Sequence, residues 1–426
     1  MTGSREPTPK QRARAAPDAV RNARAYGHDF GVLLFACAVI GPGLVMTAAS
    51  APTPFYVGLA ETMRLSPVQV AELFSLYVAP LLLALLVGGS LSDHLGRRPV
   101  LCCGFLALAA SMVLLWRADS FGALLAGRAA QGFATGGLMA TVSATVLDFE
   151  PRGAEGLAGA ANSASVMLGL ATGAACSGLL LDNVPGAWGY VFVGLAAAYA
   201  ASAVLVWLLP ETSPREPGAL RSLLPRLSVP PASRSPLARA APVLVAGWAT
   251  GGVHLSLGGM IVRDSLRVEG ALGQSAVLVT MASVGAVACL VTRRWPARRM
   301  TLVASGTLMA GTVLIAAACA LSSFPGLVLG ALVGGGGFGT AFLAVMRTLE
   351  PTVDAARKGG LLAAVYTISY LAYGVPSVAV GLLASEWGSE PAMYAASGAI
   401  VLFGAGTALA ALRRDDGSGP RCGQHV

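Results

Sequence analysis

Long apolar stretches, separated by short polar ones, recur along the whole chain of 426 residues. A helix that crosses about 30 Å of hydrocarbon needs about 20 mostly apolar residues and satisfies its own backbone hydrogen bonds. Twelve stretches meet this requirement, so the pattern predicts an all-α integral membrane protein with twelve transmembrane helices. The expected spans are Phe30–Ser50, Val68–Leu91, Pro99–Trp116, Phe121–Leu147, Leu157–Leu181, Trp188–Leu209, Pro242–Val262, Ser275–Thr292, Met300–Ser322, Pro325–Met346, Gly360–Ala384 and Ala392–Leu412.

The spans fall into two groups of six with a polar segment between them. Residues 213–241 are rich in proline and arginine, which predicts a cytoplasmic linker without a continuous helix. A shift of 200 residues superposes Gly136 on Gly336 and Glu150 on Glu350, which indicates an internal repeat. We therefore expect a tail at 1–29, six-helix bundles at 30–212 and 242–412, and a tail at 413–426. Parallel repeats of this kind are related by a pseudo-two-fold axis along the membrane normal, with a substrate site between them.

Positive charge is distributed unevenly over the predicted loops. If the N-terminus faces the cytoplasm, the tails and alternate loops on that side hold 24 of the 29 Lys and Arg residues. The outer loops hold Arg64, Arg117, Arg263 and Arg267, and Arg128 lies within a span. Because excess positive charge marks the cytoplasmic side, we expect both termini in the cytoplasm and a location in the cell (plasma) membrane.

Composition narrows the class of protein further. Hydrophobic residues make up 55% of the chain and charged residues 12%, which is too little charge to cover a soluble surface. The net charge of +8 is scattered rather than gathered into one stripe, which excludes a nucleic-acid partner. The seven cysteines form no C-x-x-C pair and no zinc-type cluster, so we expect neither a metal site nor a cofactor.

One loop carries a specific motif. Residues 89–98 read G-S-L-S-D-H-L-G-R-R and lie on the expected turn from the second to the third helix. Gly89 and Gly96 permit a tight turn, and Asp93 can face a helix N-terminus or an arginine. The segment resembles the loop signature of the major facilitator superfamily (MFS), G-x-L-x-D-R-x-G-R-R/K, although His94 stands where the family usually has arginine. The resemblance implies the MFS fold, in which two six-helix bundles enclose a central site.

The resemblance also implies a conformational latch that holds the two halves together on the inner side in one state. Its residues would be Gly89, Asp93, Gly96, Arg97 and Arg98, and we expect Asp148 and Glu150 as acidic partners of the arginines. The corresponding second-half segment, residues 293–299, reads R-R-W-P-A-R-R and has lost the aspartate. An alternative is that these arginines only follow the positive-inside rule.

Helix four carries a second pattern, R-A-A-Q-G at residues 128–132, which is similar to the family's R-x-x-Q-G. A guanidinium at this depth is costly unless it faces a cavity or a partner. In the family the equivalent arginine faces the central cavity and is linked to proton coupling or substrate contact. The alternative for Arg128 is a structural partner among the carbonyls of helix one or Glu72. We expect close helix packing at the following glycines: Gly132, Gly136, Gly137, Gly169, Gly173, Gly336 and Gly337.

Further polar and aromatic residues within the spans are candidates for substrate binding or proton coupling. Glu72 is either a protonation site or a solvated surface acid, and His254 suits a proton relay or hydrogen-bonded packing. Tyr366, Tyr370 and Tyr373 share one helix face by spacing, which suits either a cavity for an aromatic or amphiphilic substrate or core packing. The full candidate set is Glu72, Arg128, Gln131, Trp248, His254, Tyr366, Tyr370 and Tyr373.

The function expected from the sequence is secondary active transport by alternating access. Proton-coupled export of a small amphiphilic molecule is the leading hypothesis, and drug/proton antiporters of the family are a possible subtype. In those antiporters helix five carries a Gly-Pro signature, whereas this chain has Ala174 in place of the proline. The alternatives are proton-coupled uptake of a polar or anionic organic solute and, more remotely, a transport-inactive receptor or a membrane-embedded enzyme.

No nucleotide-binding loop is present. The expected partners are a small-molecule substrate, protons and membrane lipid, and the protein is expected to be a monomer and not an enzyme.

Overall fold

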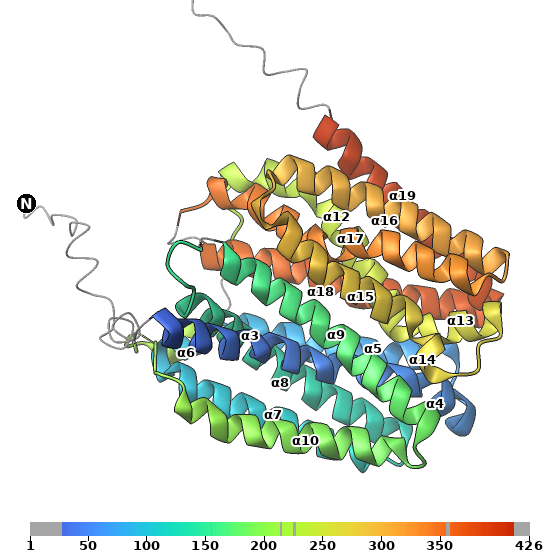
Figure 1. Ribbon diagram of the computed structural model, residues 1–426, viewed down its shortest axis with the longest axis horizontal. Helices are drawn as coiled ribbons and strands as arrows, with labels where there is room; N and C mark the ends of the chain where they lie inside the picture. The colour runs from blue at the N-terminus through green and yellow to red at the C-terminus, as the bar shows by residue number, and fades with distance from the viewer. Residues whose placement is uncertain (1–27, 155, 214, 225–226, 355–357, 413–426) are drawn as a thin grey trace, which may run out of the picture.

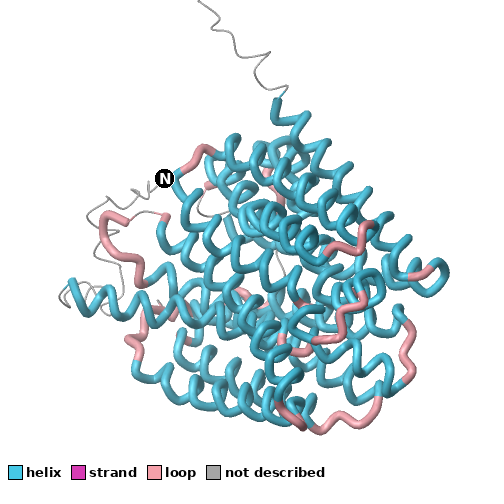
Figure 2. Tube along the Cα trace, turned by 45° about the vertical axis from the view of Figure 1, so that its right-hand side comes forward, coloured by secondary structure: helices cyan, strands magenta, loops and turns pink. Residues whose placement is uncertain are grey.

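The computed structural model describes residues 28–154, 156–213, 215–224, 227–354 and 358–412. The described residues form helices joined by short loops, with no strand among them (Figure 2). The first described helix begins, and the last one ends, at the same end of the bundle (Figure 1). We call this the proximal end and the opposite one the distal end.

The first half holds six long helices and several short ones. Its elements, with the labels of Figure 1, are α3 (His28–Ser50), a 3₁₀ turn (Thr53–Phe55), α4 (Tyr56–Met63), α5 (Pro67–Gly88), α6 (Leu91–Leu95), α7 (Arg97–Trp116), α8 (Phe121–Asp148), α9 (Leu157–Asn183), α10 (Ala187–Leu205) and a 3₁₀ turn (Val206–Leu208).

A short helix, α11 (Ala219–Ser222), lies in the connection to the second half. The second half repeats the arrangement of six long helices. Its elements are α12 (Pro231–Ser256), α13 (Gly258–Leu266), α14 (Ala271–Gln274), α15 (Ala276–Val291), a 3₁₀ turn (Thr292–Arg294), α16 (Ala297–Ala320), α17 (Phe324–Leu349), a 3₁₀ turn (Glu350–Thr352), α18 (Lys358–Trp387) and α19 (Ser389–Leu412).

The described helices account for the twelve expected crossings. Ten helical segments are long and apolar enough to cross a membrane, and the bent pair α12 and α13 makes an eleventh. The twelfth is α8, which is 28 residues long but contains Arg128, Gln131 and several glycines. These polar and small residues lower the hydropathy of α8, and Arg128, Gln131 and most of the glycines lie on its buried side.

The two halves meet through equivalent pairs of helices. On one side α5 of the first half packs against α18 of the second, and on the other side α15 packs against α9. Because α5 corresponds to α15, and α18 to α9, in the two-fold repeat, the two contacts are symmetry-related. The chain thus has the pseudo-two-fold architecture that the 200-residue repeat predicts.

The seventh span differs from the expectation in two ways. The helix begins at Pro231 rather than at 242, so residues 231–241, expected in a non-helical linker, are helical and contain Pro236. A membrane helix tolerates proline where neighbours satisfy the freed backbone groups. At the other end the span breaks at Leu257 and continues as α13 at an angle of 68°. The first span also continues past Ser50, through a 3₁₀ turn, into α4.

Glycines set the distance between neighbouring helices. A Cβ at Gly132 or Gly136 would overlap a backbone carbonyl of α5, and one at Gly169 or Gly173 would overlap the backbone of α3. Gly337 meets α16 in the same way. Gly137 and Gly336 do not share this role: the first faces open space, and the second makes only ordinary contacts with Thr307.

Candidate functional site

Arg128 is the largest fully buried side chain among the described residues, with 1% of its surface exposed. Its Nε donates to the carbonyl of Leu73 at 3.1 Å, and its Nη1 donates to the side-chain oxygen of Gln131. The guanidinium also lies over the ring of Tyr77, 4.5 Å from the centroid. Its Nη2 has no hydrogen-bond partner among the described residues. The partners of the buried cation are therefore uncharged, and one of its donors is unused.

Gln131 fixes the position of this guanidinium. The amide side chain is fully buried, and its Nε2 donates to the carbonyl of Ala48 on α3 at 2.5 Å. Gly132, the next residue, lets α8 approach the backbone of α5 at Tyr77. Three helices of the first half, α3, α5 and α8, thus converge on Arg128. The carbonyl of helix one that the sequence suggests as a partner of Arg128 is bound by Gln131 instead.

Glu72 is not part of this cluster. It precedes Leu73 on α5, but its side chain is exposed, whereas Leu73 and Phe74 are 1% exposed. No ion pair joins Glu72 and Arg128 within the described part of the chain. Consecutive side chains on a helix point about 100° apart, so the Glu72 carboxylate faces outward although its neighbours Leu73 and Phe74 face the interior.

An aromatic cluster of the second half faces the first half. Trp248 on α12 lies 4.9 Å from Tyr370 and 5.3 Å from Tyr373, ring centre to ring centre, in edge-to-face arrangements. Phe342 on α17 stacks on Tyr366 at 5.4 Å. The spacing of the three tyrosines along α18 predicts this shared face, and Phe342 comes from α17, the preceding long helix of the second half.

The helix against which Arg128 packs contacts the aromatic cluster of the second half. Phe74 of α5, three residues before Tyr77, packs edge-to-face on Tyr373 at 4.9 Å. The Tyr56 hydroxyl is buried and has no hydrogen-bond partner within the described ranges. The contact between the halves therefore offers a cation with a spare donor, a free hydroxyl and several aromatic faces.

His254 lies elsewhere, inside the second half. It lines a small cavity of about 20 Å³ between α12, α16 and α19, together with Thr250, Thr312 and Ser397. The histidine Nδ1 is buried, and no described residue forms a hydrogen bond with it. A cavity of this size holds about one water molecule. The lining residues all belong to the second half, so the structure does not bring His254 together with Arg128 or Glu72.

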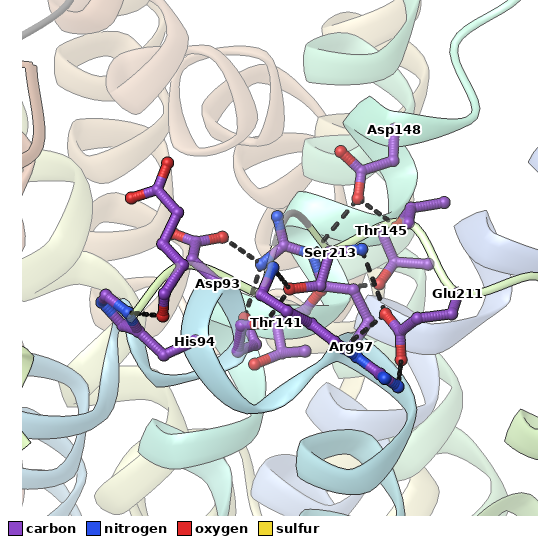
Figure 3. Close-up of polar contacts among 12 residues, drawn as sticks. Asp93, His94, Arg97, Thr141, Thr145, Asp148, Glu211 and Ser213 are labelled. Carbon is purple, nitrogen blue, oxygen red and sulfur yellow. Dashed lines mark hydrogen bonds and ion pairs between the residues drawn. The ribbon is translucent and has the colours of Figure 1, made fainter. Parts of the chain in front are cut away.

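The motif at residues 89–98 forms a polar cluster at the proximal end (Figure 3). Arg97 pairs with Asp93 at 2.6 Å and with Asp148 at 3.2 Å, and it also donates to Ser92 at 2.6 Å. Gly96 allows the turn that places them, with a φ of 108°. Arg97, Asp93 and Asp148 belong to the first half, so these ion pairs tie α6, α7 and α8 of one bundle together.

Glu211 is a member of this cluster that sequence reasoning missed. Its carboxylate accepts from the backbone N–H groups of Arg97 at 2.8 Å and Arg98 at 3.2 Å, and so caps the start of α7 (Figure 3). The next residue, Thr212, donates to Asp148 at 2.6 Å. Both follow α10 and are far from the motif in sequence, so no local spacing points to them.

Other expected members of the latch have different partners. Glu150 accepts from the backbone N–H of Ala158 at 2.8 Å, near the start of α9. Arg98 donates to the carbonyl of Leu209. Gly89 is the residue that ends α5 at its C-cap. In the second-half counterpart, Arg298, which corresponds to Arg97, donates to the carbonyl of Ala411 at 3.2 Å, and Arg299 lies over the ring of Trp295 at 4.0 Å.

Two bundles of six long helices, joined through symmetry-related contacts, define a polytopic membrane protein with a transporter architecture. The chain belongs to the Major Facilitator Superfamily, whose family model matches residues 38–375. The family expected from the two sequence motifs is thereby confirmed. No curated protein sequence matches the chain significantly.

Solved structures of MFS transporters share the fold at low sequence identity. The chain is similar to the human organic anion transporter MFSD10 (TETRAN), with 18% identity, a TM-score of 0.68 and coverage of 88% of this chain and 99% of that one. The nucleoside transporter NupG, solved as a point mutant, gives 11% identity, a TM-score of 0.68 and the same coverages. A bacterial homologue of the human lysosomal transporter Spinster, inward-facing and occupied, gives 14% identity, a TM-score of 0.66 and coverages of 91% and 98%.

Proposed function

We propose that this protein is a secondary active transporter that moves a small amphiphilic molecule across the cell membrane by alternating access. The substrate binds between the two halves, against Arg128 of the first and the aromatic cluster of the second. The single observation that carries the proposal is the buried guanidinium of Arg128, whose Nη2 is unused by the described residues and which packs on α5, a helix that contacts the second half through Phe74 and Tyr373.

The site favours a substrate with both an acidic and an apolar part. A buried charge without a charged partner is costly, and an incoming carboxylate, sulfonate or phosphate would compensate it through Nη2. The rings of Trp248, Tyr370 and Tyr373 suit an aromatic or aliphatic body. An MFS relative with 18% identity is described as an organic anion transporter, which agrees with this assignment.

We propose proton-coupled export as the mode of transport, with the proximal end in the cytoplasm. The concentration of 24 of the 29 Lys and Arg residues on that side supports the orientation. The R-x-x-Q-G pattern is linked in the family to proton coupling, which supports the proton as the coupling ion. Glu72 and His254 remain the candidate protonation sites. Uptake of a polar or anionic solute is the second candidate, which the spare donor of Arg128 favours. The working unit is a monomer.

A binding measurement tests the substrate assignment. Thermal shifts of the purified protein would be recorded with matched anionic, neutral and cationic amphiphiles of the same apolar body. We expect stabilisation by the anionic series only, and its loss in Arg128→Ala. Arg117→Ala is the control, because Arg117 also lies over an aromatic ring, that of Trp116 at 4.6 Å, but at the distal end of α7. Equal shifts with all three series, or loss of binding in both variants, would contradict the assignment.

A further inference from the structure

Polar contacts join the two halves at the distal end. The backbone N–H of Val68, in the first turn of α5, donates to Ser385 near the end of α18 at 3.3 Å. Two more polar contacts join the halves at this end. Thr53 donates to the carbonyl of Leu255 at 3.0 Å, and Arg263 on α13 pairs with Glu61 on α4 at 2.5 Å.

A further distal contact comes from Asp182 at the end of α9, which lies against the short helix α14. The distal end is therefore closed in this structure by contacts that any opening must break.

Asp182 caps a helix that belongs to the other half. Its two carboxylate oxygens accept from the backbone N–H groups of Ala271 at 2.6 Å and Leu272 at 3.0 Å, the first two residues of α14. These donors have no partner inside their own helix. The residue at the N-cap position of α14 is Gly270, which has no side chain to accept from them. The first half thus supplies the cap that the second half lacks.

The backbone is shaped to allow this contact. Gly178 lies one turn before Asp182 on α9, and a Cβ there would stand 3.0 Å from the Cα and N atoms of Leu272. A side chain there would push the backbone of α14 back by a few tenths of an ångström, so glycine favours the close contact of α9 and α14. Because α14 leads directly into α15, which also packs against α9, the cap on α14 belongs to the same contact between the halves as the packing of α15 on α9.

The distal ion pair is less able to hold the halves together. The side chains of Glu61 and Arg263 are 68% and 28% exposed. Exposed ion pairs contribute little because water and salt screen them and two long side chains lose freedom. A carboxylate that accepts two backbone donors at a helix N-terminus fixes only one short side chain.

We propose that Asp182 is the gate residue of the distal end: its cap on α14 holds the distal side closed, and its release accompanies opening toward that side. The inference rests on the proposed alternating-access transport. The cap by Asp182 joins the two halves and lies outside the motif at residues 89–98. The ion pairs of that motif, between Arg97, Asp93 and Asp148, lie within the first half.

The test measures the distance between the halves directly. Spin labels would be placed at Asp119 and Glu386, which are exposed at distal positions of the α7–α8 loop and α18, in a background freed of reactive cysteines. Pulsed electron spin resonance then gives the distribution of closed and open distances. We expect Asp182→Ala to raise the open-to-closed ratio about fivefold, the effect of losing one helix cap. Asp182→Asn, which keeps one acceptor, would give a smaller rise.

Two controls separate a gate from a merely structural cap. Asn183→Ala removes a neighbouring side chain that bonds to the Leu179 carbonyl of its own helix, at 2.8 Å, and should leave the ratio unchanged. Gly270→Ser provides α14 with a cap from its own half. If Asp182 ties the halves together, Gly270→Ser does not restore closure in the Asp182→Ala background.

An unchanged distance distribution in Asp182→Ala, or full restoration by Gly270→Ser, would overturn the proposal. The measurement needs no substrate. A failure to find transport would therefore leave its result standing, and the two failures can be told apart.

Discussion

At the scale of single residues, the chemistry gathers around Arg128, a side chain that the protein buries without a counter-ion among the described residues. The sequence predicts a costly arginine within a span and offers Glu72 as a partner, but the carboxylate is exposed and the guanidinium contacts Leu73, Gln131 and Tyr77. The sequence indicates how deep Arg128 lies in the membrane, but it does not indicate which neighbouring helix the side chain faces. The partners of a side chain depend on the direction in which it points and on the helices packed there.

Removal of the buried charge should destabilise the fold only moderately. Arg128→Met keeps the apolar stem of the side chain and removes a cation whose partners are all uncharged. We expect the free energy of unfolding to fall by at most about 1–3 kcal/mol, because the change removes a costly buried charge but leaves the buried side-chain oxygen of Gln131 without its donor. Thermal unfolding of the detergent-purified variant measures this. A drop of several kcal/mol would show that Arg128 serves the structure rather than a substrate.

The proximal cluster makes a different prediction. Asp93→Asn removes one of the two carboxylates that pair with Arg97 and leaves Asp148 in place. We expect turnover in liposomes to fall at least about tenfold while the substrate dissociation constant changes less than about twofold, since the cluster lies at the proximal end, away from Arg128. Flux and binding measured on the same preparation distinguish the two effects. Loss of binding with normal turnover per bound substrate would contradict the role of the cluster in the transport cycle.

At the scale of helices, close packing through glycine explains why α8 is weakly hydrophobic and yet crosses the protein. Gly132 and Gly136 lie one turn apart and face the backbone of α5, whereas Gly137 faces open space. The Gly136-Gly137 pair is visible in the sequence, but only the packing says which of the two carries the contact. The bend of 68° at Leu257 has no proline, but Gly258 and Gly259 directly follow it, and adjacent glycines are weak points in a helix.

Substitution of these glycines gives a matched test. Gly136→Ala forces a methyl group into the Leu81 carbonyl and should destabilise the protein by about 1–3 kcal/mol, the cost of overpacking. Gly137→Ala meets no neighbour and should be neutral or stabilising by up to about 1 kcal/mol, because alanine is the better helix former. Thermal unfolding of both variants provides the comparison. Equal effects at the two positions would mean that α5 and α8 do not touch as described.

At the scale of the molecule, periodicity and charge were enough to predict the spans and the repeat, because lipid imposes both the length and the apolar character of each crossing. In the structure the two repeats contact each other through two equivalent helix pairs, α5 with α18 and α15 with α9. Two contacts between distant helices escaped prediction: Phe74 against Tyr373 and Asp182 against α14 join residues that no local pattern relates. These contacts depend on how helices and bundles dock, which a single sequence does not specify.

The central claim is that the two halves carry an organic anion through the membrane in exchange for protons. Flux in proteoliposomes tests it most directly, with a labelled aromatic anion present and a pH gradient imposed in either direction. The account predicts substrate accumulation only with the gradient that drives export, proton movement linked to substrate, and loss of both in Arg128→Ala but not in Arg117→Ala. Substrate flux that is indifferent to the pH gradient and to Arg128 would contradict it.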